Sequence, residues 1–101
     1  MMAYTPLTDA EISERLTKLA SWEREGDKIT KTFKFDKYLE GTAFASAIGV
    51  VCEAQNHHPD LTIGYKTVKV SFSTHDIGNR LSEKDFVTAA AVDALGFPKP
   101  K

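Results

Sequence analysis

All three histidines of the chain lie in two short stretches, NHHPD at positions 56–60 and THD at 74–76. An imidazole gains and loses a proton near neutral pH, so histidine suits general acid–base catalysis as well as metal binding. The carboxylates near these stretches along the chain include Glu53, Asp76 and Asp85. A neighbouring carboxylate can orient an imidazole and favour its protonated form. These side chains are therefore the first candidates for chemistry.

The first stretch lies at the predicted end of a helix. Glu53 and His57 are four residues apart, so on a helix they share one face, and we expect Glu53 to hold His57. His58 is then about 100° further round the helix and faces a different part of the same pocket. Pro59 disfavours a helical backbone at His58, so the helix should end just before or within His-His-Pro. His75 ends the last predicted strand, and the strand pair before it can return it to the helix end.

Residue chemistry alone leaves three interpretations of the histidines open. They can be polar residues at a helix end and a strand end, with no role in chemistry. They can bind zinc, which accepts three histidine ligands in catalytic sites. However, neighbouring histidines on a regular helix are poorly placed to share a metal, and the chain has no HExxH or paired-cysteine motif. They can also transfer protons without a metal, because imidazoles titrate near neutrality and carboxylates can tune them.

The pattern of the N-terminal half predicts a helix, a hairpin and a second helix. Thr8 and Glu11 have capping-box spacing before an apolar stripe, which predicts a helix that stops near 20–21. Turn residues at 26–27 then join a short strand to a second strand of alternating polarity. Over 36–56, apolar residues return at helical spacing among several alanines, which predicts the second helix.

The C-terminal half predicts two more strands and a last helix. Positions 61–75 alternate between apolar and polar residues on both sides of a tight turn near Lys66. Ser82 is the expected N-cap of the last helix, and Gly96 stands where the residue just past its C-terminus is expected. The order α-β-β-α-β-β-α predicts an α+β fold, with a four-stranded, mostly antiparallel sheet and helices packed on one face. We expect one domain over 1–101, with two sheet edges able to pair with another subunit.

Composition and charge narrow the classes of function. The chain has 101 residues and a net charge of −1, so it has no basic field for nucleic acid and we expect no nucleic-acid partner. No apolar run approaches the roughly 20 residues that span a bilayer, and the first residues lack the features of a secretory signal. Cys52 is the one cysteine, which predicts a small buried apolar side chain and fits a reducing compartment. We therefore expect a cytoplasmic protein without a membrane partner.

The stretch EAQNHHPDLTIGYKTVKVSFSTHD at 53–76 resembles the signature of the pterin-4a-carbinolamine dehydratase family. That signature combines an acidic residue, His-His-Pro, a tyrosine and a Val-rich strand that ends in Thr-His-Asp. Trp22 before the predicted hairpin and LSEKD at the start of the last helix are also similar to the family, so the resemblance covers essentially the whole chain. The chain departs from the family at Asn79 and Arg80, where a small residue is usual. It also departs at Leu61 and Ile63, in a region that is aromatic in some members.

The resemblance implies dehydration of 4a-hydroxytetrahydropterin to quinonoid dihydropterin and water, in tetrahydrobiopterin recycling, without a metal or an organic cofactor. By the same resemblance, His57 and His75 form the acid–base pair, and His58 binds and orients the pterin. Which histidine is the acid and which is the base stays open. The implied catalytic residues are His57, His58, His75 and Glu53, and the implied substrate-binding residues are His58, Asp76 and Asp85.

The resemblance also bears on the aspartates and on assembly. Asp76 or Asp85 is expected to support His75 or to bind the pterin ring. Members of the family assemble through sheet edges and helices, so the resemblance implies a homodimer or a homotetramer. The alternative from a different class of function is a non-catalytic, oligomeric binding or regulatory partner protein of the same fold.

Overall fold

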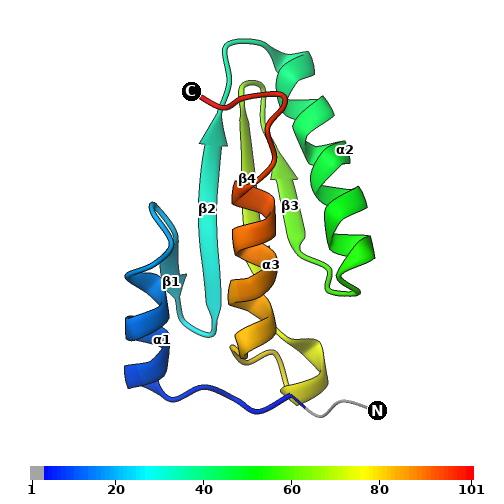
Figure 1. Ribbon diagram of the computed structural model, residues 1–101. Helices are drawn as coiled ribbons and strands as arrows, with labels where there is room; N and C mark the ends of the chain where they lie inside the picture. The colour runs from blue at the N-terminus through cyan, green and yellow to red at the C-terminus, as the bar shows by residue number, and fades with distance from the viewer. Residues whose placement is uncertain (1–3) are drawn as a thin grey trace.

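An antiparallel sheet of four strands carries the helices on one face (Figure 1). The computed structural model describes residues 4–101. Its elements are α1 (Asp9–Leu16), β1 (Glu23–Glu25), β2 (Lys28–Lys34), α2 (Tyr38–Ala54), β3 (Asp60–Ile63), β4 (Thr67–Phe72), a short 3₁₀ helix (His75–Ile77) and α3 (Glu83–Asp93). The strands pair in the order β1-β2-β4-β3, and α2 packs beside α3 and against β4. The predicted α+β fold and the predicted order of its helices and strands are confirmed.

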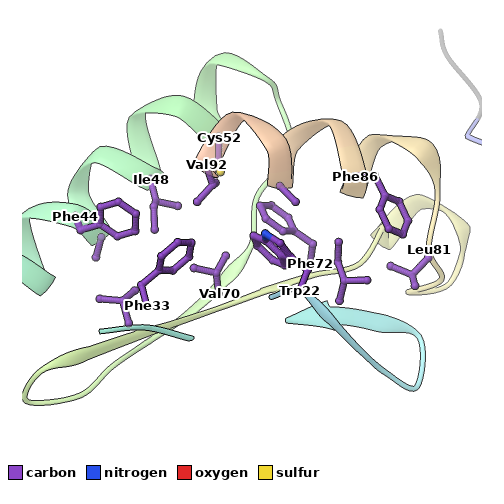
Figure 2. Close-up of a cluster of buried hydrophobic side chains, with 14 of the residues drawn as sticks. Trp22, Phe33, Phe44, Ile48, Cys52, Val70, Phe72, Leu81, Phe86 and Val92 are labelled. Carbon is purple, nitrogen blue, oxygen red and sulfur yellow. The ribbon is translucent and has the colours of Figure 1, made fainter. Parts of the chain in front are cut away.

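Alternation along β4 divides the sheet into a buried face and an open face. Val68, Val70 and Phe72 are fully buried under the helices, whereas the residues between them are only partly buried. Trp22 packs on Phe72, with ring centroids 5.8 Å apart. Figure 2 shows these rings near Val70, in the layer between the helices and the sheet, with Phe44 further along the same layer. Removal of this apolar surface from water fixes the helices on the sheet and thereby the positions of their ends.

The polar residue in the middle of β2 interrupts the apolar alternation but has a partner. Lys31 shares the side of Ile29 and Phe33, and its Nζ lies 2.9 Å from Asp93 Oδ1 and 4.7 Å from the centroid of the Phe33 ring. The Asp93 carboxylate also accepts a hydrogen bond from Trp22 Nε1 at 2.9 Å. The buried stem and paired ammonium of Lys31 therefore tie β2 to the end of α3.

The two predicted helix caps, Thr8 and Ser82, are confirmed, and each belongs to a capping box. The Thr8 hydroxyl accepts from Glu11 N at 3.2 Å, and Glu11 Oε1 accepts from Thr8 N at 2.9 Å. At the start of α3, the Ser82 hydroxyl accepts from Lys84 N at 3.3 Å, and Asp85 Oδ2 accepts from Ser82 N at 2.9 Å. Each box satisfies backbone donors that a helix start otherwise leaves without partners.

Two predicted helix ends are wrong. α1 ends at Leu16, earlier than expected, because the chain turns through Ser21, whose φ is 69°, to bring Trp22 into the core. The C-cap of α3 is Ala94, ahead of Gly96, and it keeps a right-handed backbone that needs no glycine. Among the helices described within 4–101, none has the length and apolar character to cross a membrane.

β3 is an edge strand and is shorter than expected. It ends at Ile63, and the predicted alternation does not continue to Tyr65. Tyr65 is 73% exposed and stacks on Tyr38 of α2, with ring centroids 6.4 Å apart, rather than entering the core. An aromatic side chain just after β3 and one at the start of α2 therefore share one exposed surface.

Several segments that are far apart in the sequence meet at one end of the molecule (Figure 1). The last turn of α2, the end of β4, the 3₁₀ helix and the first turn of α3 all lie there. The N-terminal segment joins them, because Leu7 N donates a hydrogen bond to Leu81 O at 2.9 Å. Both histidine stretches belong to this end.

Candidate active site

A cavity of about 260 Å³ opens at this end of the molecule. Its volume is near the lower limit for ligand sites in proteins, so it suits a small ligand. The lining residues are Tyr4, Asn56, His57, His58, Ser73, Thr74, His75 and Asp76. The structure thus brings the three histidines and Asp76 to one cavity, whereas Glu53 and Asp85 do not line it.

A left-handed residue after α2 directs His57 into the protein. Asn56 has a φ of 52°, a conformation that asparagine tolerates better than most residues. His57 N donates to Cys52 O at 3.1 Å and Asn56 N donates to Glu53 O at 3.0 Å, which is a Schellman motif. The helical path therefore stops before His57, and only 7% of the residue is exposed.

Asp85 holds His57 from the buried side of the imidazole, away from the cavity. His57 Nε2 lies 2.6 Å from Asp85 Oδ1, and Asp85 is fully buried. The His57 ring also stacks on Phe72, with ring centroids 5.9 Å apart and planes inclined by 10°. A hydrogen bond and a ring contact together fix the orientation of the imidazole.

The pairing with Asp85 determines which nitrogen of His57 can exchange a proton. The other carboxylate oxygen of Asp85 accepts from the Thr74 hydroxyl at 2.7 Å and from Ser82 N at 2.9 Å. A carboxylate surrounded by donors can only accept, so Nε2 of His57 carries its hydrogen toward Asp85. Nδ1 is the nitrogen that remains for a ligand in the cavity.

Glu53 pairs with His58, and the expectation that it holds His57 is wrong. Glu53 Oε1 lies 2.7 Å from His58 Nε2. The helical spacing that suggested the other pair does not apply, because Asn56 ends the helix before His57. The side chains of His58 and Glu53 are 58% and 79% exposed, so water screens this pair strongly.

The 3₁₀ helix presents His75 and Asp76 at the mouth of the cavity. Both residues are exposed, and both line the cavity. Asp85 does not support His75, because its hydrogen bonds go to His57, Thr74 and Ser82. Its full burial also keeps Asp85 from touching a ligand. Both expected roles of Asp85, support of His75 and binding of the pterin ring, are therefore wrong, and Asp85 supports His57 instead.

The cluster differs from a metal site and from a thiol nucleophile site. Among residues 4–101, no group of three or more histidine, cysteine, aspartate or glutamate side chains is arranged to hold a metal ion. The three-histidine zinc interpretation therefore has no geometric counterpart in this part of the chain. Cys52 is fully buried, as expected from its position on the helix, and burial raises the pKa of its thiol to about 11. The thiol thus packs as a neutral apolar group.

Four residues that line the cavity were not predicted from the sequence: Tyr4, Asn56, Ser73 and Thr74. Tyr4 lines the cavity because the hydrogen bond from Leu7 to Leu81 returns the N-terminal segment to this end, and no local pattern indicates that return. Thr74 lines the cavity and bonds Asp85. The capping-box spacing of Ser82 and Asp85 was a usable indication that this carboxylate lies at a helix start.

The model of the family described as pterin 4 alpha carbinolamine dehydratase matches residues 5–95. The chain belongs to this family. A protein of Natronomonas pharaonis that carries the family's name is 47% identical over 89 residues, which cover 88% of this chain and 94% of that protein. A second relative of the same name, from Roseiflexus castenholzii, is 44% identical and covers 88% of this chain and 95% of its own. The chain is accordingly an enzyme of the hydro-lyase class.

Two solved structures have the same fold. The transcriptional coactivator/pterin dehydratase from Brucella melitensis superposes with a TM-score of 0.83 at 29% identity, over 89% of this chain and 97% of that one. A pterin dehydratase-like protein, described as a RuBisCO assembly factor in the alpha-carboxysome, gives a TM-score of 0.62 at 28% identity, over 78% of this chain and 93% of its own. The fold of the family is therefore found both in a protein named as a dehydratase and in one named for an assembly role.

Proposed function

We propose that the cavity dehydrates 4a-hydroxytetrahydropterin by histidine acid–base catalysis. The hydroxyl group leaves C4a as water, and N5 loses its proton, which gives the quinonoid dihydropterin. One group must donate a proton to the leaving oxygen, and another must accept a proton. The observation that carries the proposal is that His57 and His75 line one cavity from different elements, with His57 held by Asp85.

The two histidines have different surroundings, which suits different roles in one turnover. His57 is buried and hydrogen-bonded through Nε2, so its Nδ1 has a fixed direction. His75 is exposed at the start of the 3₁₀ helix, where it can exchange protons with water. A positioned imidazole and a solvent-accessible one can together supply and remove the protons that the dehydration requires.

The remaining lining residues suit the binding of a flat, polar ring. His58, which pairs with Glu53 at the surface, is proposed to orient the pterin. Asp76 can accept hydrogen bonds from the ring N–H and amino groups of a pterin. Tyr4 offers an aromatic side chain in a cavity whose other lining side chains are polar, so we assign it a stacking contact with the ring.

The proposal extends to the setting of the enzyme. Its substrate would arise in tetrahydrobiopterin recycling in the cytoplasm, where the product is reduced again, and residues 1–101 would act as one domain. We also propose a homodimer or homotetramer formed through α2 and β3. Large apolar side chains are exposed on these two elements and beside them, at Tyr38, Leu39, Val50, Ile63 and Tyr65.

An assay of the dehydration tests the proposed activity. Purified protein added to freshly generated 4a-hydroxytetrahydropterin should accelerate formation of the quinonoid product, followed by its absorbance. His75→Ala should lower kcat by about 100-fold or more, because loss of a general acid or base typically costs that much. A wild-type protein that does not accelerate the reaction, or a His75→Ala variant with full activity, would refute the proposal.

A second candidate function is a binding role that uses the fold without its chemistry. It is favoured by the exposed apolar surface of α2 and β3 and by the assembly role named for a solved relative. Purification of the tagged protein from its source would then recover a stable partner. Retention of that partner by a His57→Ala, His75→Ala double variant would support this function, and its absence from the wild type would count against it.

A further inference from the structure

A chain of hydrogen bonds runs from the first turn of α3 to His57, behind the cavity. Lys84 N donates to Ser82 Oγ at 3.3 Å, and Ser82 Oγ lies 2.7 Å from Thr74 Oγ1. Thr74 Oγ1 donates to Asp85 Oδ2 at 2.7 Å. Asp85 Oδ1 then contacts His57 Nε2 at 2.6 Å. Residues from the helix start, the end of β4 and the end of α2 are thereby joined in one line.

The direction of each hydrogen bond follows from the number of hydrogens available. A hydroxyl carries one hydrogen, and a carboxylate carries none. Thr74 must give its hydrogen to Asp85, so it can only accept from Ser82. Ser82 therefore donates to Thr74 and accepts from Lys84 N. All donors along the chain point toward the carboxylate of Asp85.

Burial makes this arrangement hard to change. Thr74, Ser82 and Asp85 are 2%, 1% and 0% exposed. Among residues 4–101, every buried side-chain nitrogen or oxygen has a hydrogen-bond partner. Rotation of the Asp85 carboxylate would leave the Thr74 hydroxyl without an acceptor, and a buried polar group without a partner is destabilising. The two hydroxyls thus hold the carboxylate in one orientation.

We infer that Thr74 and Ser82 are positioning residues for the proton transfer at His57. By fixing the orientation of Asp85, they keep the hydrogen of the neutral imidazole on Nε2 and aim Nδ1 into the cavity. The inference rests on the proposed function of His57. It also gives the capping box of α3 a second role, because the residues that start the helix hold the imidazole as well.

Thr74→Val tests the inference, since it removes the hydroxyl and keeps the shape of the side chain. We expect kcat to fall about tenfold with little change in KM, because a hydrogen bond to a buried charged group is lost. The ¹⁵N NMR spectrum of His57 should lose the pattern of a single Nε2–H tautomer. Thr74→Ser, which restores a hydroxyl, should recover both kcat and the tautomer pattern.

Thr88→Val is the matched control. Thr88 is fully buried in α3, and its hydroxyl donates to Lys84 O at 2.8 Å, outside the chain that leads to His57. This variant loses a buried hydroxyl of the same kind and should keep the wild-type kcat and tautomer pattern. Circular dichroism and melting temperature of both variants verify that they are folded.

Two results would overturn the inference. One is a folded Thr74→Val variant with the wild-type kcat and tautomer pattern of His57. The other is an equal loss of kcat in Thr74→Val and Thr88→Val without a change of tautomer, which would indicate a general loss of stability. The NMR measurement needs no substrate, so it remains decisive for the hydrogen-bond chain even if the wild type fails to dehydrate the pterin.

Discussion

Two carboxylate–histidine pairs of nearly equal length stand at the cavity, and burial separates their roles. Asp85 lies 2.6 Å from His57 Nε2, and Glu53 lies 2.7 Å from His58 Nε2. The side chains of the first pair are 0% and 8% exposed, and those of the second are 79% and 58% exposed. Water screens the second pair, so its hydrogen bond contributes little to holding the imidazole. At the residue scale, His57 is therefore the imidazole with the more defined direction.

This difference predicts unequal effects of the same chemical change. Asp85→Asn should lower kcat by about 100-fold or more, because an amide can also donate and no longer requires the hydrogen of His57 on Nε2. Glu53→Gln, the control with the same loss of charge, should leave kcat within about threefold of the wild type. Steady-state kinetics of pterin dehydration measures both. Equal losses of kcat in the two variants would contradict the roles assigned here.

Tyr4 should affect binding of the substrate more than its conversion. Tyr4→Ala should raise KM about fivefold and leave kcat nearly unchanged, because an aromatic stacking contact is lost while the histidines stay in place. Tyr4→Phe keeps the ring and should have the wild-type KM. The two variants are compared by steady-state kinetics and by quenching of fluorescence with a dihydropterin. A Tyr4→Phe variant whose KM is as high as that of Tyr4→Ala would show that the hydroxyl, and not the ring, makes the contact.

At the scale of elements, α2 illustrates what the sequence could and could not predict. Its apolar spacing and Pro59 correctly predicted a helix that ends before His-His-Pro. The partner of Glu53 was predicted wrongly, because the prediction extended the helical backbone through His57. The left-handed Asn56 redirects His57 toward Asp85, which is 28 residues away along the chain. A contact between such distant residues leaves no trace in local spacing.

Cys52 on the buried side of α2 gives the protein a pH-dependent stability. Burial raises the pKa of its thiol from 9.0 to about 11. The unfolded chain therefore releases this proton at lower pH than the folded one, so stability falls as pH rises from 9 to about 11. The loss should be roughly 2 kcal/mol.

Denaturant unfolding of the wild type and of Cys52→Ala at several pH values measures this effect. Cys52→Ala leaves a cavity and should be the less stable protein at pH 8. Since it lacks the thiol, the stability difference between the two proteins should shrink by roughly 2 kcal/mol between pH 9 and 11. A difference that stays constant over this range would contradict the effect of burial on the thiol. The comparison with the variant cancels the titration of lysines and tyrosines that both proteins share.

At the scale of the whole molecule, the outer face of α2 combines exposed apolar side chains with a neighbouring sheet edge. Leu39 and Val50 of α2 are 74% and 71% exposed, and β3 next to it is a sheet edge. Exposed apolar residues gathered beside an open strand edge are typical of surfaces that are covered in an assembly. The candidate active-site cavity lies at the end of α2. In an assembly through the outer face of α2, the same helix would therefore contribute to both the interface and the candidate site.

Charge on this surface should prevent assembly. Light scattering coupled to size-exclusion chromatography should give a dimer or tetramer for the wild type and a monomer for the Leu39→Glu, Val50→Glu double variant. Val87→Glu, at a position of α3 that is 47% exposed, is the control and should keep the mass of the wild type. A monomeric wild type, or a double variant of unchanged mass, would contradict the proposed assembly.

In the proposed reaction, His57 and His75 act together in one dehydration step. The most direct test is the kcat of the wild type, His57→Ala, His75→Ala and the double variant with 4a-hydroxytetrahydropterin. We predict that kcat falls by about 100-fold or more in each single variant. The kcat of the double variant should be little lower than that of the less active single variant, because the effects of removing groups that act as a unit are not additive. Independent losses that multiply in the double variant, or full activity in either single variant, would contradict the account.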